Sequence, residues 1–174
     1  MYKQSLNTSS GMWALWDYDA YKEVCDYEDW EPLFCEDKDI EKQIAKMSFV
    51  PIYIHEDGCC DFTLKINESL VEKEEKYMCV QSEEYLFYSH GKVVLSGIDY
   101  ISSTISKNNG IIIDLPKGYY SVTVYLISWD EDPQAFLPDG NISPDALSDF
   151  IVLLKSEDSI ENKVYRKSLE TFES

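Results

Sequence analysis

Basic side chains are scarce in this sequence of 174 residues. Only 15 residues are Lys or Arg, with Arg166 the single arginine, against 33 Asp and Glu, so the formal net charge is −18. Binding to nucleic acid depends on Lys and Arg that neutralise phosphates, and anionic lipid surfaces attract the same residues. The composition therefore argues against direct binding to nucleic acid or to a membrane. It favours a basic protein partner, with acidity that serves only solubility as the alternative.

Long apolar runs are also missing. The longest reach five residues, as in Phe150–Leu154, whereas a helix that spans a membrane needs about 20. The start, Met1–Ser5, is not a basic segment followed by an apolar one, so we expect no secretory signal and a cytoplasmic location. Neither the G-x-S-x-G nucleophile motif nor a glycine-rich phosphate loop occurs, which removes the usual sequence signals of hydrolases and nucleotide-binding enzymes.

Potential metal ligands are few and poorly spaced. The five cysteines are an odd number without a C-x-x-C pair, and His55 and His90 are the only histidines. The best available combination is His55 with Cys59 and Cys60, but adjacent residues of a strand point to opposite faces. We therefore predict no metal and no cofactor, and we interpret the cysteines as reduced, small apolar side chains.

Hydrophobic periodicity predicts many short strands. A helix is expected near Asp37–Lys46, where Ile40, Ile44 and Met47 recur at helical spacing. Residues 49–54 and 60–67 alternate with period two and are expected to form a hairpin around Glu56–Gly58. Further strands are expected at 12–16, 77–80, 85–88, 92–95, 111–115 and 119–129, and a last strand or short helix at 146–155.

This pattern favours one all-β domain, an antiparallel β-sandwich of about seven to eight short strands with one short N-terminal helix. Within the single domain 1–174, the sequence divides into an acidic, aromatic segment (1–47), the sandwich core (48–155) and a polar tail (156–174). We expect the tail to be a loosely held segment or a surface helix.

Acidic and aromatic residues are concentrated in two places that are candidates for partner binding. Between Asp17 and Glu41 there are eleven acids and only two lysines, interleaved with Tyr and Trp, which are typical anchors of protein interfaces. A second acidic group lies in the Asp-, Pro- and Gly-rich loop 130–145. We predict partner contacts at two groups of residues, the first being Asp17, Asp19, Glu28, Asp29 and Trp30, and the second Asp130, Glu131 and Asp132.

One strand-turn-strand resembles a known family. The segment Ile111–Val124 contains Asp114-Leu115-Pro116-Lys117-Gly118-Tyr119-Tyr120, which is similar to a motif of the bacterial competence nuclease-inhibitor family. The resemblance extends from Phe49 to Trp129. The chain is also similar to the wider group of immunity proteins, which are small acidic binders. The resemblance implies a non-enzymatic inhibitor that blocks a basic nuclease or toxin.

Two other functions are compatible with the composition. A β-sandwich can bind a small ligand or carbohydrate by stacking sugar rings on an aromatic face, and this is the main alternative. A hydrolase that uses two carboxylates is the other, although 33 acids make such pairs uninformative. Salt dependence separates the inhibitor from the carbohydrate-binding module, because association of an acidic with a basic protein weakens with salt and sugar binding does not.

Overall fold

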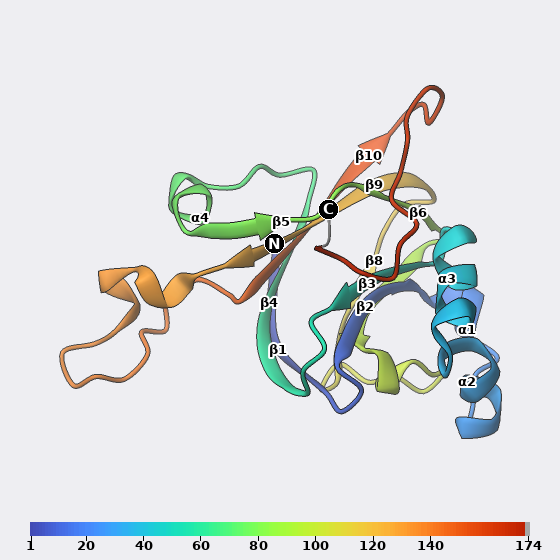
Figure 1. The fold of residues 1–174 in the computed structure, drawn as a ribbon, viewed down its shortest axis with the longest axis horizontal. Coiled ribbons are helices and arrows are strands. Elements are labelled where there is room, and N and C mark those ends of the chain that lie inside the picture. The colour runs from blue at the N-terminus through green and yellow to red at the C-terminus, as the bar shows by residue number, and fades with distance from the viewer. Residues whose placement is uncertain (173–174) are drawn as a thin grey trace.

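The strands form two sheets whose inner faces pack together (Figure 1). The structure is a computed structural model, and it describes residues 1–172. The first sheet, sheet A, has the strand order β1-β4-β10-β9-β5, with β6 also paired to β9. Its strands are β1 (Tyr2–Thr8), β4 (Gly58–Ile66), β5 (Met78–Gln81), β6 (Tyr85–Ser89), β9 (Gly118–Ile127) and β10 (Phe150–Glu157).

The second sheet, sheet B, has the order β3-β2-β7-β8. Its strands are β2 (Met12–Asp17), β3 (Phe49–Tyr53), β7 (Lys92–Gly97) and β8 (Gly110–Asp114), and all of its pairs are antiparallel. The helices are α1 (Tyr18–Tyr21), α2 (Tyr27–Phe34), α3 (Asp37–Ala45) and α4 (Glu72–Lys76). Three short 3₁₀ turns accompany them, η1 (Ile98–Tyr100), η2 (Trp129–Glu131) and η3 (Pro133–Ala135).

The prediction of a strand-rich, two-sheet architecture is confirmed, but its details are partly wrong. β10 runs parallel to β4, with Phe150 opposite Phe62 and Leu154 opposite Ile66, so the sheets are not purely antiparallel. The described residues contain ten strands, and three helices, not one, lie in the N-terminal segment. The helix expected at Asp37–Lys46 is α3, and the last element is the strand β10.

The hairpin expected over residues 49–67 is also wrong. β3 pairs with β2 at the edge of sheet B, whereas β4 lies in sheet A between β1 and β10. Both faces of the second half of β4 are buried, with Phe62 and Leu64 on one side and Thr63 and Lys65 on the other. β4 pairs with β1 on one edge and β10 on the other, so it is an interior strand of sheet A.

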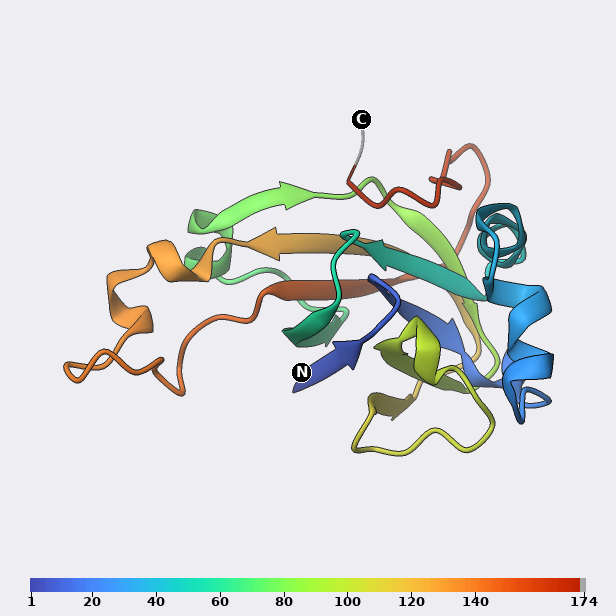
Figure 2. The same cartoon turned by 60° about the horizontal axis from the view of Figure 1, so that its bottom comes forward.

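Two buried tryptophans of β2 organise the interior. Trp13 lies between the sheets, with its ring centroid 5.4 Å from that of Phe62 and 6.2 Å from that of Phe150, and its Nε1 donates to the carbonyl of Leu6. Trp16 packs against α1, with its ring centroid 6.3 Å from that of Tyr18 and 6.1 Å from that of Tyr21, and its Nε1 donates to the Ser96 hydroxyl. Helices α1–α3 close one end of the sandwich, as Figure 2 shows.

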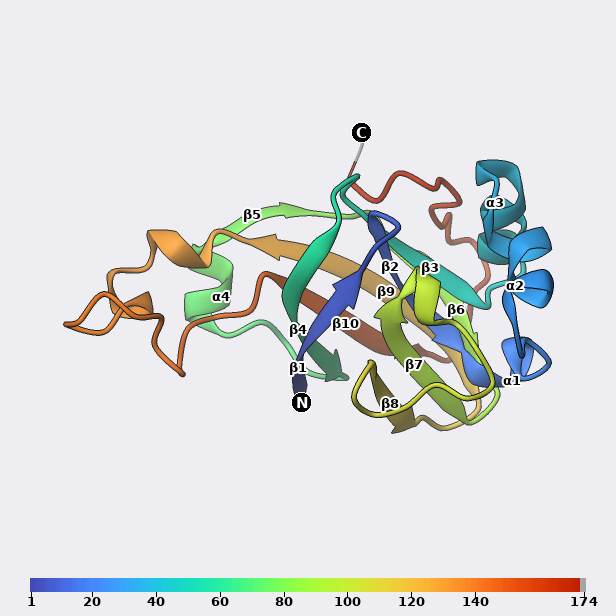
Figure 3. The ribbon, with the colours of Figure 1, turned by 90° about the horizontal axis from the view of Figure 1, so that it is seen from below.

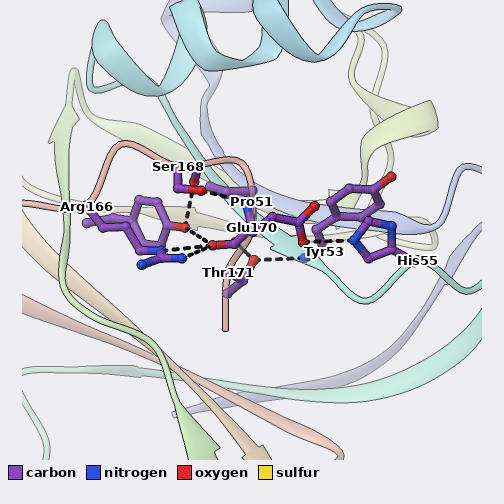
Figure 4. A network of polar contacts seen from close by, with 8 residues as sticks. Pro51, Tyr53, His55, Arg166, Ser168, Glu170 and Thr171 are labelled. Carbon is purple, nitrogen blue, oxygen red and sulfur yellow. Dashed lines mark hydrogen bonds and ion pairs between the residues drawn. The ribbon is translucent and has the colours of Figure 1, made fainter. Parts of the chain in front are cut away.

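The second half of the predicted polar tail, residues 166–172, is held against the sandwich and forms no helix. Leu169 and Thr171 are buried, and the Thr171 hydroxyl bridges β3 by donating to the carbonyl of Pro51 and accepting from the amide of Tyr53 (Figure 4). The phenol of Tyr85 donates to the Ser168 carbonyl at 2.8 Å. Residues 166–172 therefore form a strap that connects β6 of sheet A to β3 of sheet B.

Candidate partner-binding surfaces

Asp17 is not available to a partner. Its side chain is fully buried at the end of β2, where one oxygen accepts from the amide of His90 at 3.0 Å and the other contacts His90 Nδ1 at 2.7 Å. The prediction of Asp17 as a surface contact is therefore wrong. The turn between β6 and β7 takes up this carboxylate, and it is 73 residues away in the sequence.

The other predicted acids of the N-terminal segment, Asp19, Glu28 and Asp29, lie on the surface of α1 and α2. Asp19 is exposed and pairs with Lys22 at 3.0 Å, and the hydrogen bond from Lys22 lowers the pKa of Asp19. Glu28 and Asp29 lie in the first turn of α2 and are exposed. The Asp26 side chain caps this helix by accepting from the Asp29 amide at 3.0 Å.

Trp30 forms one wall of a groove of about 500 Å³ between α2 and η1. Its Nε1 donates to the carbonyl of Ile98 at 2.9 Å, and its ring lies 5.8 Å from that of Tyr27 at an interplanar angle of 23°. Asp26 and Asp99 line the same groove. Acidic and aromatic groups thus meet here around the predicted Trp30.

The second predicted acidic group lies on a loop, residues 129–147, that projects from sheet A. Asp130 and Glu131 are exposed in η2. Asp132 is buried, because it caps η3 by accepting from the Gln134 amide at 2.9 Å and pairs with Lys73 of α4. The prediction of Asp132 as a contact is therefore wrong, and the ion pair with Lys73 lowers the pKa of this carboxyl.

Three large apolar side chains are exposed at the tip of the projecting loop. Phe136, Leu137 and Ile142 have 43%, 41% and 58% of their surface accessible. The tip is held by backbone hydrogen bonds, since the Leu137 amide donates to the Asn141 carbonyl at 2.7 Å and Phe136 and Ile142 form a β-bridge. Exposed apolar side chains on an ordered tip are typical of a binding surface.

The two acidic groups do not form one surface. Helices α1–α3 lie at one end of the molecule, and the projecting loop lies at the other, as all three views show (Figures 1–3).

Sequence reasoning missed the apolar tip and the groove residue Asp99. Phe136, Leu137 and Ile142 stand among Pro, Gly and Asp residues, and large apolar residues in such a turn-rich segment were the available signal. No sequence signal indicated Asp99, because it is 69 residues from Trp30 and reaches the groove only through η1.

The interpretation of the cysteines as small apolar side chains of the core is wrong, because Cys25, Cys35, Cys59 and Cys79 are exposed and Cys60 is half-buried; all five are free thiols. Within residues 1–172, no three His, Cys, Asp or Glu side chains come together as a possible metal site. His55 contacts Glu170 at 2.8 Å.

Trp13 and Trp16 are fully buried and cannot stack on a sugar ring. Among the described helices, none is long and apolar enough to cross a membrane.

The fold and the site define a small, strand-rich protein of two packed sheets with acidic surfaces at both ends. By sequence, the chain matches no known family model and no curated protein. Two solved structures share its fold, and both are matched over 90% of this chain.

One of these structures is "Crocagin biosynthetic gene J", with a TM-score of 0.58, 15% identity and 99% of that chain covered. The other is ComJ of Bacillus subtilis, described as an inhibitor of the DNA-degrading activity of NucA, with a TM-score of 0.51, 16% identity and 96% of that chain covered. The second likeness confirms, for the fold, the resemblance to the competence nuclease-inhibitor family. Because this likeness covers 90% of the chain, it extends beyond residues 49–129.

The motif that carries the resemblance has a structural role. Residues 114–118 carry the chain from β8 in sheet B to β9 in sheet A. Leu115 is buried, and the Tyr120 phenol donates to the Pro116 carbonyl at 2.8 Å. Gly118 has a φ of +146°, which side chains disfavour. This segment therefore defines the crossing between the sheets.

Proposed function

We propose that the protein is a non-enzymatic inhibitor of the immunity type, which binds a basic nuclease or toxin and blocks it, with the cytoplasm as its location. The observation that carries the proposal is the projecting loop. No Lys or Arg occurs between Lys117 and Lys155, whereas residues 129–149 contain six acids. Support also comes from the shared fold with ComJ, an inhibitor of the nuclease NucA.

The proposed mechanism is occlusion of the nuclease cleft. A nuclease must attract phosphates, so its cleft is expected to be positive, and a convex acidic loop is complementary to it. Asp130 and Glu131 would take the place of phosphates, while the apolar tip around Phe136 and Leu137 supplies buried area. The loop is already ordered by its own hydrogen bonds and by the Asp132–Lys73 pair, which reduces the entropy lost on binding.

The acids of the helical end are proposed to act through the overall field and as a second contact. Asp19, Glu28 and Asp29 add negative charge, which raises the rate of encounter with a basic partner. Trp30 would contribute to such a contact through the groove that it lines.

The test compares two double variants that change the net charge equally. Asp130→Lys/Glu131→Lys alters the loop, and Glu28→Lys/Asp29→Lys alters α2. The nuclease is first recovered from host lysate on the tagged protein at about 50 and 300 mM salt, against an equally acidic unrelated protein, because screening weakens this association. Degradation of DNA by the purified nuclease is then measured with each inhibitor variant.

The wild-type protein is expected to stop degradation at a stoichiometric excess. We expect the loop variant to inhibit at least tenfold more weakly than the wild-type protein. The α2 variant should be weakened much less. Degradation that continues unchanged with wild-type protein would refute the inhibitor function. A larger loss in the α2 variant would move the contact to the helical end.

A further inference from the structure

The groove beside Trp30 is lined by two aspartates, Asp26 and Asp99, that have no basic partner among the described residues. Asp99 accepts from the hydroxyls of Thr8 and Ser9, both at 2.9 Å. All of these donors are neutral, so the negative charge of the groove persists.

The aromatic wall is fixed and partly open to solvent. Trp30 is held by its hydrogen bond to Ile98 and by its contact with Phe34, at 5.6 Å between ring centroids. Tyr27 stacks on Trp30 with one face, yet 62% of its surface remains accessible. An exposed, fixed aromatic face next to negative charge is the usual surface for a cation–π contact.

The dipole of α2 does not cancel this charge. The N-terminus of a helix carries about half a positive charge, whereas Asp26, Glu28 and Asp29 bring three carboxylates to the start of α2. Glu31 adds a fourth near Tyr27, and its charge raises the pKa of the Tyr27 phenol. A cation in the groove is therefore favoured.

We propose that this groove binds the guanidinium group of an arginine presented by a protein partner. The planar guanidinium can stack on the open face of Tyr27 and donate hydrogen bonds to the carboxylates of Asp26 and Asp99. A volume of about 500 Å³ accommodates such a side chain. An ammonium is more strongly hydrated and lacks the planar face, so lysine fits less well.

This site deepens the second contact proposed at the helical end and rests on that part of the proposed function, although it lies away from the projecting loop (Figure 3). Its test needs no nuclease. Failure of arginine binding and failure of nuclease inhibition are therefore separate results.

The experiment is a titration of the full chain with Nα-acetyl-arginine amide, followed by the indole N–H signals of the four tryptophans in NMR spectra. Each indole reports a different place, because Trp13 and Trp16 are in the core, Trp30 is in the groove and Trp129 is at the base of the projecting loop. We expect a saturable shift of the Trp30 signal and none at Trp129. Trp129 thus controls for nonspecific attraction to acidic surface.

Two variants test the proposed contacts. Tyr27→Leu keeps the net charge and is expected to weaken binding roughly two- to fivefold, whereas Tyr2→Leu, at an exposed tyrosine of β1, is the matched control without effect. Asp26→Asn keeps a good helix cap and is expected to weaken binding roughly fivefold.

Specificity for a guanidinium on a protein is tested by two further probes. Nα-acetyl-lysine amide and free L-arginine, whose carboxylate the groove repels, are both expected to bind more weakly. Equal binding of the lysine amide, tighter binding of free L-arginine, equal shifts at Trp129, or unchanged affinity in Tyr27→Leu would each overturn the proposal.

Discussion

Replacing Lys65 with Met is expected to destabilise the protein strongly, although it exchanges a charged side chain for an apolar one of similar length. Lys65 Nζ lies 2.6 Å from Glu74 Oε2, and the two side chains are only 2% and 7% exposed. Lys65→Met leaves the Glu74 carboxylate buried with one remaining donor, the Val71 amide at 2.8 Å. Removing one partner of a buried pair costs about 3–5 kcal/mol. We expect about 3 kcal/mol, because α4 is short and can detach to hydrate Glu74.

The double variant Lys65→Met/Glu74→Leu provides the decisive comparison. Replacing both charges with apolar side chains is often neutral, and the Val71 amide loses its acceptor at a cost of about 1 kcal/mol. We therefore expect the double variant to be about 2 kcal/mol more stable than Lys65→Met alone. The free energy of unfolding is measured in urea by tryptophan fluorescence. Lys38→Met breaks the exposed pair with Glu36 and serves as a control that leaves the midpoint unchanged.

Two results would refute this reasoning. Lys65→Met with a wild-type midpoint would mean that Glu74 is hydrated without its partner. A double variant that is less stable than either single variant would mean that the two charges do not depend on each other.

Three further predictions concern other buried groups. Burial near Asp149 raises the pKa of Cys60 to about 12, so at pH 8 Cys60 should react with iodoacetamide at least tenfold more slowly than the exposed Cys59; equal rates by mass spectrometry would contradict this. Lys73 lowers the pKa of Asp132 below its usual 3.8, so the pair stabilises the fold above about pH 4. This stabilisation is lost as the pH falls through the pKa of Asp132 in the folded state. Thermal melts of Asp132→Asn should thus differ from wild type at pH 7 but converge in acid, and a constant difference would disprove the linkage. Leu169→Ala should cost about 2–3 kcal/mol in urea unfolding, whereas Val164→Ala, at a position 97% exposed, should cost nothing measurable; equal midpoints would show that the strap contributes no stability.

The elements could be predicted from the sequence better than their partners. Alternation at 60–67 locates β4, but its pairing with β10 depends on residues about 88 positions away, as for Phe62 and Phe150. Local periodicity contains no information about such a pairing. It favours the nearest strand in sequence as the partner, which produces the wrong hairpin.

The candidate site shows the same limit. Local composition predicts surface positions for Glu28, Asp29 and Trp30, and the structure places the two acids on the surface and Trp30 in a groove. Composition fails for Asp17 and Asp132, because distant residues, His90 and Lys73, take up their carboxylates. The sequence does not reveal whether the carboxylate of an acidic residue faces solvent or pairs with another residue inside the fold.

The central position of β10 has a consequence for how the chain folds. β10 is the last strand along the sequence, yet it joins β4 to β9 within sheet A. Until residues 150–157 pair, sheet A exists as two separate pieces, each with an open strand edge. Closing such long-range pairings is slow, and open edges promote aggregation of incompletely folded chains. The net charge of −18 makes these chains repel one another during that interval, so the acidity also protects the folding intermediate.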